Sequence, residues 1–353
     1  MATSSVLLSD QAVQSFKRIV ETSKNRMSII LSHVDPDSIG SALAMQEILS
    51  SFGRNANIYY CGYFGHPQNR AIANKFNLKN IFLPIEKLED YENDFVLLDS
   101  SAINDERLCQ AKDKLNPIII IDHHRGMRTK IDDQNFHWIE DMGACCTLLI
   151  ELMEKLEIKI EKKTALVLAL GIFTDTKSLV SCKDEDLLAY LSMKAHFQPE
   201  EFNDSVNYAL PESHYHNINV ATGGFRREGA SLVASCGYMD ASNGDDLASL
   251  ADFFIRMEGV TFVLVWGIIG GVLRICARNE NMTVPLDEYL KKNFSERAGA
   301  KLTPDGRGEG GVKFELSNIG FWLDEGTQEE FLKLAKKKIE NVVFAKQENG
   351  NGK

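Results

Sequence analysis

Four groups of aspartate and histidine residues occur in the first half of the chain, each at the end of a predicted strand. The groups are His33 with Asp35 and Asp37; Asp99; Asp122 with His123 and His124; and Asp175. Carboxylate oxygens mixed with imidazole nitrogens suit Mn²⁺ or Mg²⁺ better than a metal that prefers thiolates. Because the carboxyl ends of strands in an open α/β sheet share one crevice, these residues can converge there. The pattern predicts a single site for two metal ions.

The first group lies in a loop whose local geometry suits this chemistry. Asp35 and Asp37 are two residues apart, so in an extended segment their side chains face the same way. Pro36 restricts the loop by fixing φ. A helix expected from about Ser38 to Ser51 directs backbone N–H groups toward the same crevice, which favours a phosphate. Taken alone, the pattern of Asp35 and Asp37 equally fits one Asp that caps a helix beside another Asp in a turn. The presence of the other three groups favours metal ligation.

The third group follows four consecutive isoleucines, Ile118–Ile121, a pattern typical of a buried central strand. Adjacent side chains leave a strand in different directions, so His123 and His124 are expected to have different roles. A carboxylate at the position of Asp99 can bridge two cations. Alternatively, Asp99 caps a helix beginning near Ile103, and Asp175 is a structural residue near a helix end.

With these four groups in this order, the chain resembles the DHH family of phosphoesterases, which is named for its Asp-His-His triplet. The resemblance implies an α/β fold: an N-terminal parallel sheet with helices on both faces, and a smaller mixed-sheet lobe across a cleft. It divides the chain into a catalytic domain at 1–195, a helical linker at 196–220, a DHH-associated substrate-binding domain at 221–320, and a C-terminal helix and tail at 321–353.

The resemblance also implies a role for each residue of the site. His124 would face the phosphate, and Asp122 would hold a histidine ring or ligate directly. His33 departs from the family's pattern, because fewer residues separate it from Asp35 than the family usually has. The implied ligands of two Mn²⁺ ions, with Mg²⁺ as the alternative, are His33, Asp35, Asp37, Asp99, His123 and Asp175.

Two features of the C-terminal half are suited to binding a phosphorylated substrate. Arg274 and Arg278 are four apart on a predicted strand and therefore share one face, and a guanidinium matches phosphate oxygens. A solvated strand face is the alternative. Gly306 to Gly311 is predicted to be a glycine-rich loop that an anion can approach closely, or else a simple turn. The substrate-binding candidates are Arg274, Arg278, Arg307, Gly308, Gly310 and Gly311.

The composition restricts the class of protein and substrate. The chain has 353 residues, 44% of them hydrophobic, which is enough for two domains with cores of their own. Seven cysteines without a Cys-x-x-Cys pair indicate buried free thiols in a reducing compartment. The N-terminus lacks the features of a signal peptide, and no apolar run is long enough to span a membrane. We therefore expect a cytoplasmic protein, with a homodimer as one option for its assembly.

The expected function is hydrolysis of short oligonucleotides or nucleotide-like phosphoesters through attack by a hydroxide shared between two metals. The net charge of −11 disfavours broad binding of long duplex DNA, which depends on many cationic contacts. A short single-stranded nucleic acid or a nucleotide is the expected partner. Two alternatives stay open: a pyrophosphatase or exopolyphosphatase, and a non-catalytic sensor that binds a nucleotide.

Overall fold

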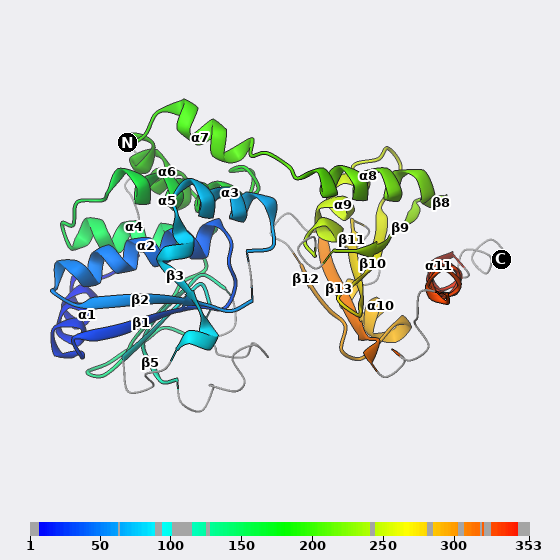
Figure 1. Ribbon diagram of the computed structural model, residues 1–353. Helices are drawn as coiled ribbons and strands as arrows, with labels where there is room; N and C mark the ends of the chain where they lie inside the picture. The colour runs from blue at the N-terminus through cyan, green and yellow to red at the C-terminus, as the bar shows by residue number, and fades with distance from the viewer. Residues whose placement is uncertain are drawn as a thin grey trace. The chain divides into compact units, whose positions relative to one another are not determined.

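The apolar runs that precede the Asp and His groups lie largely in one sheet. The computed structural model describes residues 7–62, 64–88, 94–100, 115–124, 128–240, 244–280, 285–302, 307–317, 320 and 326–344. It divides the chain into two units, Met1–Ala209 and Leu210–Lys353, which Figure 1 colours from blue to green and from green to red. The division falls inside the expected helical linker. Each unit is described by itself.

The first unit contains a seven-stranded sheet in the order β3-β2-β1-β4-β5-β7-β6. Its strands are β1 (Arg26–Leu31), β2 (Asn55–Tyr60), β3 (Phe82–Pro84), β4 (Asp94–Leu98), β5 (Pro117–Asp122), β6 (Lys130–Ile131) and β7 (Phe136–Ile139). Neighbouring strands are parallel except β6 and β7. The direction of winding changes between β1 and β4, which are adjacent. In open α/β sheets, ligands bind at the carboxyl ends of strands beside such a switch point.

Helices of the first unit share a large core with one face of this sheet. They are α1 (Asp10–Thr22), α2 (Pro36–Ser51), α3 (Pro67–Lys75), α4 (Cys145–Lys155), α5 (Lys162–Asp175), α6 (Asp184–Lys194) and α7 (Pro199–Val206), with 3₁₀ turns η1 (Leu78–Asn80) and η2 (Ile85–Lys87). Ile29, Val96 and Ile119 lie in that core, whereas Ile30, Leu97 and Ile120 form a smaller one on the opposite face. Residues 101–114, part of the connection to β5, lie outside the described residues, so helices on both faces stay a prediction for this sheet.

Glycines allow α2, α4 and α5 to pack closely beside the predicted site. A Cβ atom on Gly171 of α5 would lie 2.6 Å from Cys146 Sγ and 2.8 Å from Asp37 Cα. A Cβ atom on Gly40 of α2 would lie 2.8 Å from the same sulfur. Any larger residue at these positions would push apart the three helices that surround Asp37.

The second unit is the mixed sheet that the sequence predicts, in the order β12-β13-β11-β10-β9-β8. Its elements are α8 (Glu212–Gly224), β8 (Arg226–Glu228), β9 (Ser231–Met239), α9 (Asp246–Phe254), β10 (Phe262–Ile269), β11 (Val272–Asn279), α10 (Leu286–Asn293), β12 (Gly299–Leu302), β13 (Gly308–Glu315) and α11 (Gln328–Phe344). Only β9 and β10 pair in parallel among its described strands. Helices α8 and α9 cover one face, and α10 and α11 cover the other.

Two local predictions are wrong. Asp175 is the last residue of helix α5 rather than the end of a strand. Gly308, Gly310 and Gly311 lie in strand β13 rather than in a loop, and Gly306 lies outside the described residues. A Cβ atom on Gly310 would lie 2.6 Å from the Cβ of Ala300, so this glycine allows close strand and helix packing.

Other sequence predictions agree with the structure. Six described cysteines are free thiols, four of them buried. In the described parts of the chain we find no helix with the length and apolar character needed to cross a membrane.

Candidate metal centre

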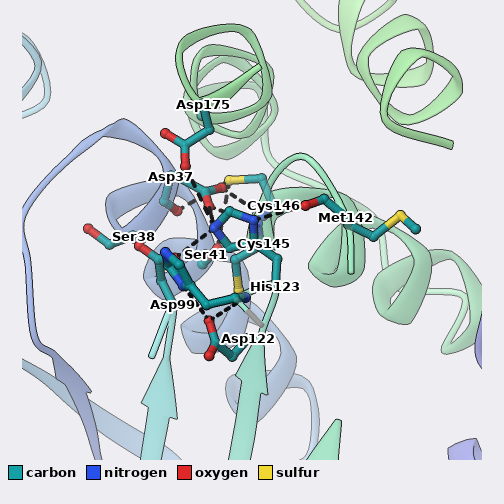
Figure 2. A network of polar contacts seen from close by, with 12 residues as sticks. Asp37, Ser38, Ser41, Asp99, Asp122, His123, Met142, Cys145, Cys146 and Asp175 are labelled. Atoms are coloured by element: carbon teal, nitrogen blue, oxygen red, sulfur yellow. Dashed lines mark hydrogen bonds and ion pairs between the residues drawn. The ribbon is translucent and has the colours of Figure 1, made fainter. Parts of the chain in front are cut away.

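Side chains from the ends of strands β4 and β5, the start of helix α2 and the end of helix α5 meet at the switch point between β1 and β4 (Figure 2). His123 lies at their centre. Its Nε2 atom is 3.3 Å from Asp99 Oδ1, 3.7 Å from Asp37 Oδ2 and 3.7 Å from Asp175 Oδ2. The structure therefore brings together four residues that the sequence analysis assigned to metal ions.

Among the residues that the structure describes, two sets have ligand atoms within 4.8 Å of one another, and both include His123. One set is Asp99, His123 and His124; the other is Asp37, His123 and Asp175. Because the Nε2 atom of His123 has one lone pair and can bind only one cation, the two sets form one continuous cluster of candidate ligands rather than the separate ligands of two ions.

The backbone of Asp99 has a conformation that few residue types adopt. The residue follows β4 directly and has a φ of 54°, in the left-handed region that Asp and Asn tolerate better than most. Its N–H donates to the Ile121 carbonyl at the end of β5, 3.0 Å away. This bond fixes the carboxylate between the two strands. Burial, together with the charges of Asp35 and Asp37, raises the pKa of Asp99 well above its usual value.

The carboxylate of Asp37 joins α2 to the start of α4. It is fully buried, and its two oxygens accept hydrogen bonds from the Cys145 and Cys146 N–H groups at 2.7 and 2.8 Å. Helix α4 has Ala144 at its N-cap, which offers no side-chain acceptor, so Asp37 supplies the negative charge and acceptor that a helix N-terminus requires. Burial still raises the pKa of Asp37 above its usual value.

The hydrogen bonds of His123 indicate which nitrogen is available for a metal. Nδ1 lies 3.1 Å from the Met142 carbonyl oxygen, which can only accept, so Nδ1 carries a proton. The neutral ring then presents a lone pair at Nε2, the atom that faces the carboxylates. Burial opposes the charged ring, but Asp37 and Asp175 outweigh it and raise the pKa of His123. A histidine held by a carbonyl through its second nitrogen is the usual form of a metal ligand.

His124 has a different environment from its neighbour. Asp122 Oδ1 accepts from His124 Nδ1 at 2.8 Å and from its backbone N–H at 3.2 Å. This hydrogen bond is the main reason that the pKa of His124 is raised, and it leaves Nε2 for another partner. The side chain of His124 is 52% exposed, against 11% for His123, so the two rings differ in access to a substrate.

The remaining predicted ligands lie at the edges of this cluster. Asp35 is the N-cap of α2: one of its oxygens accepts from the Ser38 N–H at 2.9 Å, which is the capping role considered as an alternative. Its charge also contributes to the raised pKa of Asp99 and of Asp175, after burial. His33 is exposed and belongs to neither set of ligand atoms.

Three buried polar atoms of the cluster have no hydrogen-bond partner: Asp99 Oδ1, Asp122 Oδ2 and His123 Nε2. Buried polar atoms normally have hydrogen-bond partners, so three such atoms without one in the same place are available to coordinate a cation. The cluster also gathers several carboxylates out of water, which is costly without a cation. Burial raises the pKa of Cys145 and Cys146 well above normal, so both thiols keep their protons. The donor set therefore fits a hard divalent cation such as Mn²⁺ or Mg²⁺.

The raised pKa values predict how pH affects the metal-free protein. A carboxyl group with a higher pKa in the folded state contributes stability that is full below its unfolded pKa, near 3.8, and is lost as pH rises through the folded pKa. We expect Asp99→Asn, which cannot ionise, to unfold at a higher temperature than the unsubstituted protein at pH 8 in a chelator. Near pH 4 the two should unfold at similar temperatures. An equal difference at both pH values would show that ionisation of Asp99 is not the cause.

The candidate substrate-binding residues lie in the second unit, and the structure gives each a partner or a place in the sheet. The Nε and Nη2 atoms of Arg278 donate to the two oxygens of Asp252, at 2.5 and 3.1 Å. Arg274 shares that face of β11, and its Nε is buried without a hydrogen-bond partner. Arg307 forms an ion pair with Glu280 at 3.0 Å. As predicted, Arg274 and Arg278 lie on one face of a strand.

Sequence reasoning missed the residues that hold the ligands in place. The Met142 carbonyl positions His123, and the N–H groups of Cys145 and Cys146 position Asp37. One signal was available. The helix starting at Cys145 has no Ser, Thr, Asp or Asn at its cap, so its first N–H groups need an acceptor from elsewhere in the fold.

Comparison with known proteins gives a consistent result. Residues 28–172 match the sequence profile described as the DHH family, N-terminal domain. The chain is 29% identical over 286 residues to an uncharacterised protein of Methanocaldococcus jannaschii, covering 78% of this chain and 56% of that one. It is 26% identical over 167 residues to a manganese-dependent inorganic pyrophosphatase of Bacillus subtilis, covering 46% and 52%. The chain thus spans about half the length of these curated relatives.

Two solved structures share the fold. An exopolyphosphatase-related protein from Bacteroides fragilis superposes with a TM-score of 0.71 at 16% identity, covering 94% of this chain and 99% of that one. The exonuclease RecJ bound to manganese gives a TM-score of 0.50 at 12% identity, with 97% of each chain covered. At these identities the likeness extends to the fold alone.

Proposed function

Because residues 28–172 form the N-terminal domain of the DHH family, we propose that this chain is a metal-dependent phosphoesterase. The family predicted from the four Asp and His groups is confirmed for these residues. The assignment of residues 221–320 to a DHH-associated domain stays a prediction. The observation that carries the proposal is the convergence of His123 Nε2 and Asp99 Oδ1, both buried without hydrogen-bond partners, with two further carboxylates at the switch point of the sheet.

The proposed metal ligands are Asp35, Asp37, Asp99, His123 and Asp175, with His33 as a further ligand if its loop is reshaped. Two Mn²⁺ or Mg²⁺ ions, when bound, would activate the attacking water and offset charge on the phosphoryl group. The residues of the chain prepare the site for them. Asp99 would be the ligand that the two ions share, Asp37 is held at the start of α4, and the Met142 carbonyl orients His123.

His124 is the proposed catalytic contact with the substrate. Asp122 fixes its ring through Nδ1 and favours the protonated form, which has a raised pKa. A protonated imidazole whose second nitrogen is accessible can donate to a phosphoryl oxygen as charge develops there. This role differs from that of His123, whose nitrogens are directed to Met142 and to the carboxylates.

The proposed substrate is a short single-stranded oligonucleotide or a nucleotide-like phosphoester. The acidic chain favours small anionic substrates over long duplexes, and RecJ, which shares the fold, is an exonuclease. Inorganic pyrophosphate or polyphosphate is the second candidate, because the Bacillus subtilis relative is a pyrophosphatase. A cytoplasmic location belongs to the same proposal.

A substrate panel tests this proposal. A dinucleotide, a 3′,5′-phosphorylated nucleoside, pyrophosphate and a short polyphosphate should be incubated with the metal-stripped protein and added Mn²⁺. We expect product release from the first two to exceed that from the others. Faster release from pyrophosphate or polyphosphate would support the second candidate. Binding of nucleotides without any metal-stimulated product would instead indicate a non-catalytic sensor.

Arg278 is proposed to contact a substrate phosphate, and its pairing with Asp252 refines that prediction. The pair uses two N–H groups of the guanidinium, and a third donates to the Ala277 carbonyl, so two remain. We expect Arg278→Ala to lower kcat/KM for a multi-nucleotide substrate by roughly 10–150-fold, mainly through KM, because a contact with a charged group is lost. The affinity for Mn²⁺ should not change.

A small generic phosphodiester and the variant Arg278→Lys serve as controls for this prediction. The small substrate should be hydrolysed almost as before by Arg278→Ala. Arg278→Lys keeps the charge but not the planar fork, so it should recover only part of the affinity for the longer substrate. Equal damage to both substrates would place Arg278 in catalysis or folding and would contradict a substrate-selecting role for the second unit.

A further inference from the structure

Asp186 is a buried carboxylate on α6 that belongs to neither set of proposed ligands. It is fully shielded from solvent. Oδ1 accepts from the Thr147 hydroxyl at 2.6 Å, and Oδ2 accepts from the N–H groups of Gly143 and Lys183 at 3.0 and 2.8 Å. Capping of α6 explains the bond from Lys183 but not those from Gly143 and Thr147. Asp186 therefore does more than cap the start of its own helix.

The bonds from Gly143 and Thr147 attach Asp186 to the segment that holds two proposed ligands. Met142, directly before Gly143, accepts from His123 Nδ1 through its carbonyl. The N–H groups of Cys145 and Cys146, between Gly143 and Thr147, donate to Asp37. The position of this segment thus determines the orientation of the His123 ring and of the Asp37 carboxylate.

Asp186 also fastens the turn that follows Asp175. Lys177, Ser178 and Leu179 have φ values of 52°, 60° and 68°, a run of left-handed residues without glycine. Such a conformation persists only where the surrounding structure enforces it. Ser181 N–H donates to the Thr176 carbonyl, and Lys183 N–H, at the end of the turn, donates to Asp186.

Gly143 connects these two regions by close packing. A Cβ atom at this position would lie 2.4 Å from Asp186 Oδ2 and 2.5 Å from Thr176 Cγ2. Thr176 is fully buried and adjoins Asp175. One carboxylate is therefore in contact with the segment behind His123 and Asp37 and with the turn beside Asp175.

We propose that Asp186 is a positioning residue of the metal centre: it fixes the Met142–Gly143 peptide and the turn after Asp175, and so sets the orientation of His123, Asp37 and Asp175. The inference rests on the proposed function, since it requires those residues to ligate metal. It assigns Asp186 no contact with metal or substrate. Carboxylates that act through a ligand in this way usually affect metal affinity by about 10–100-fold.

The test is the Mn²⁺ affinity of Asp186→Asn, measured by calorimetry on the full chain, together with the thermal unfolding of the metal-free protein. Asparagine keeps the size of the side chain but brings its own N–H donors against groups that already donate. We expect the variant to fold and to bind Mn²⁺ about 10–100-fold more weakly. Unchanged affinity in a folded Asp186→Asn would overturn the inference.

Asp246→Asn is a matched control in the second unit. Asp246 is also almost fully buried, accepts from Asn217 Nδ2 at 2.7 Å and pairs with His214 at 2.8 Å. This variant should lose thermal stability but keep its Mn²⁺ affinity. An equal loss of affinity in both variants would show that buried-charge removal in general, not the position of Asp186, is responsible.

Two further results distinguish a variant that does not fold, an incorrect role for Asp186 and an incorrect proposed function. If Asp186→Asn does not fold, Thr147→Val removes one hydrogen bond to the carboxylate with little change of shape, and its Mn²⁺ affinity should fall several-fold. Unchanged affinity in that variant would overturn the inference. If the unsubstituted protein binds no Mn²⁺, the proposed function itself fails, whatever the variants do.

Discussion

Asp99→Ala is expected to abolish binding of at least one Mn²⁺ ion and to reduce turnover by more than about 100-fold, the upper end of the effect of residues that act through a ligand. Asp99 lies between β4 and β5, and its Oδ1 is buried, without a hydrogen-bond partner, 3.3 Å from His123 Nε2. As the proposed shared ligand, it should affect both ions. Calorimetry with Mn²⁺ and a turnover assay on the same preparation would measure the two losses together.

Asp99→Asn is the control for the unusual backbone at this position. Asparagine tolerates the left-handed conformation nearly as well as aspartate, whereas alanine does not. Both variants remove the charge, so both should lose Mn²⁺, but only Asp99→Ala should carry a backbone penalty in thermal unfolding. Normal binding of two Mn²⁺ ions by Asp99→Asn would exclude this residue as a shared ligand.

Substitution of the two adjacent histidines is expected to affect metal binding and turnover differently. His123→Ala should weaken Mn²⁺ binding strongly, because it removes the nitrogen at the centre of both sets of ligand atoms. His124→Ala should leave Mn²⁺ binding nearly intact and lower kcat by about 10²–10³-fold, the usual range for loss of one donor to charge that develops in the transition state. The different partners of their Nδ1 atoms, Met142 and Asp122, are the structural reason.

Metal affinity and kcat should be measured for both histidine variants in one buffer. If His123 is a metal ligand and His124 a substrate contact, Mn²⁺ affinity should fall in His123→Ala only. In His124→Ala, kcat should fall without a loss of Mn²⁺ affinity. A similar loss of Mn²⁺ affinity in His123→Ala and His124→Ala would contradict this distinction and would make both residues ligands, as the set that His124 shares with Asp99 allows.

The periodicity of the sequence was sufficient to predict where most residues of the candidate metal centre lie. Runs such as Ile118–Ile121 are typical of buried strands in a parallel sheet, and the residue after each strand must lie at its carboxyl end. Convergence of Asp99 and His123 follows from that geometry. Asp175 reached the same place from the end of helix α5, because α5 packs against α2. This is the helix end considered as the alternative for Asp175, not the end of a strand.

Features that depend on tertiary contacts could not be predicted in this way. Nothing in the local sequence of Asp37 indicates that it caps a helix more than 100 residues later. The glycines at 308–311 read as a loop because glycine is common in turns, yet close packing against β12 and α10 makes them a strand. The pairing of Arg278 with Asp252 likewise depends on where α9 crosses the sheet.

The central claim is that a divalent-metal centre built around His123 and Asp99 hydrolyses phosphoesters. The most direct measurement is the rate of dinucleotide hydrolysis by the metal-stripped protein as Mn²⁺ is added back, with Asp99→Asn assayed in parallel. We predict that hydrolysis rises with Mn²⁺ until two ions are bound, and that the variant stays at the level of a blank. Hydrolysis that is independent of Mn²⁺, or equal in the two proteins, would contradict the claim.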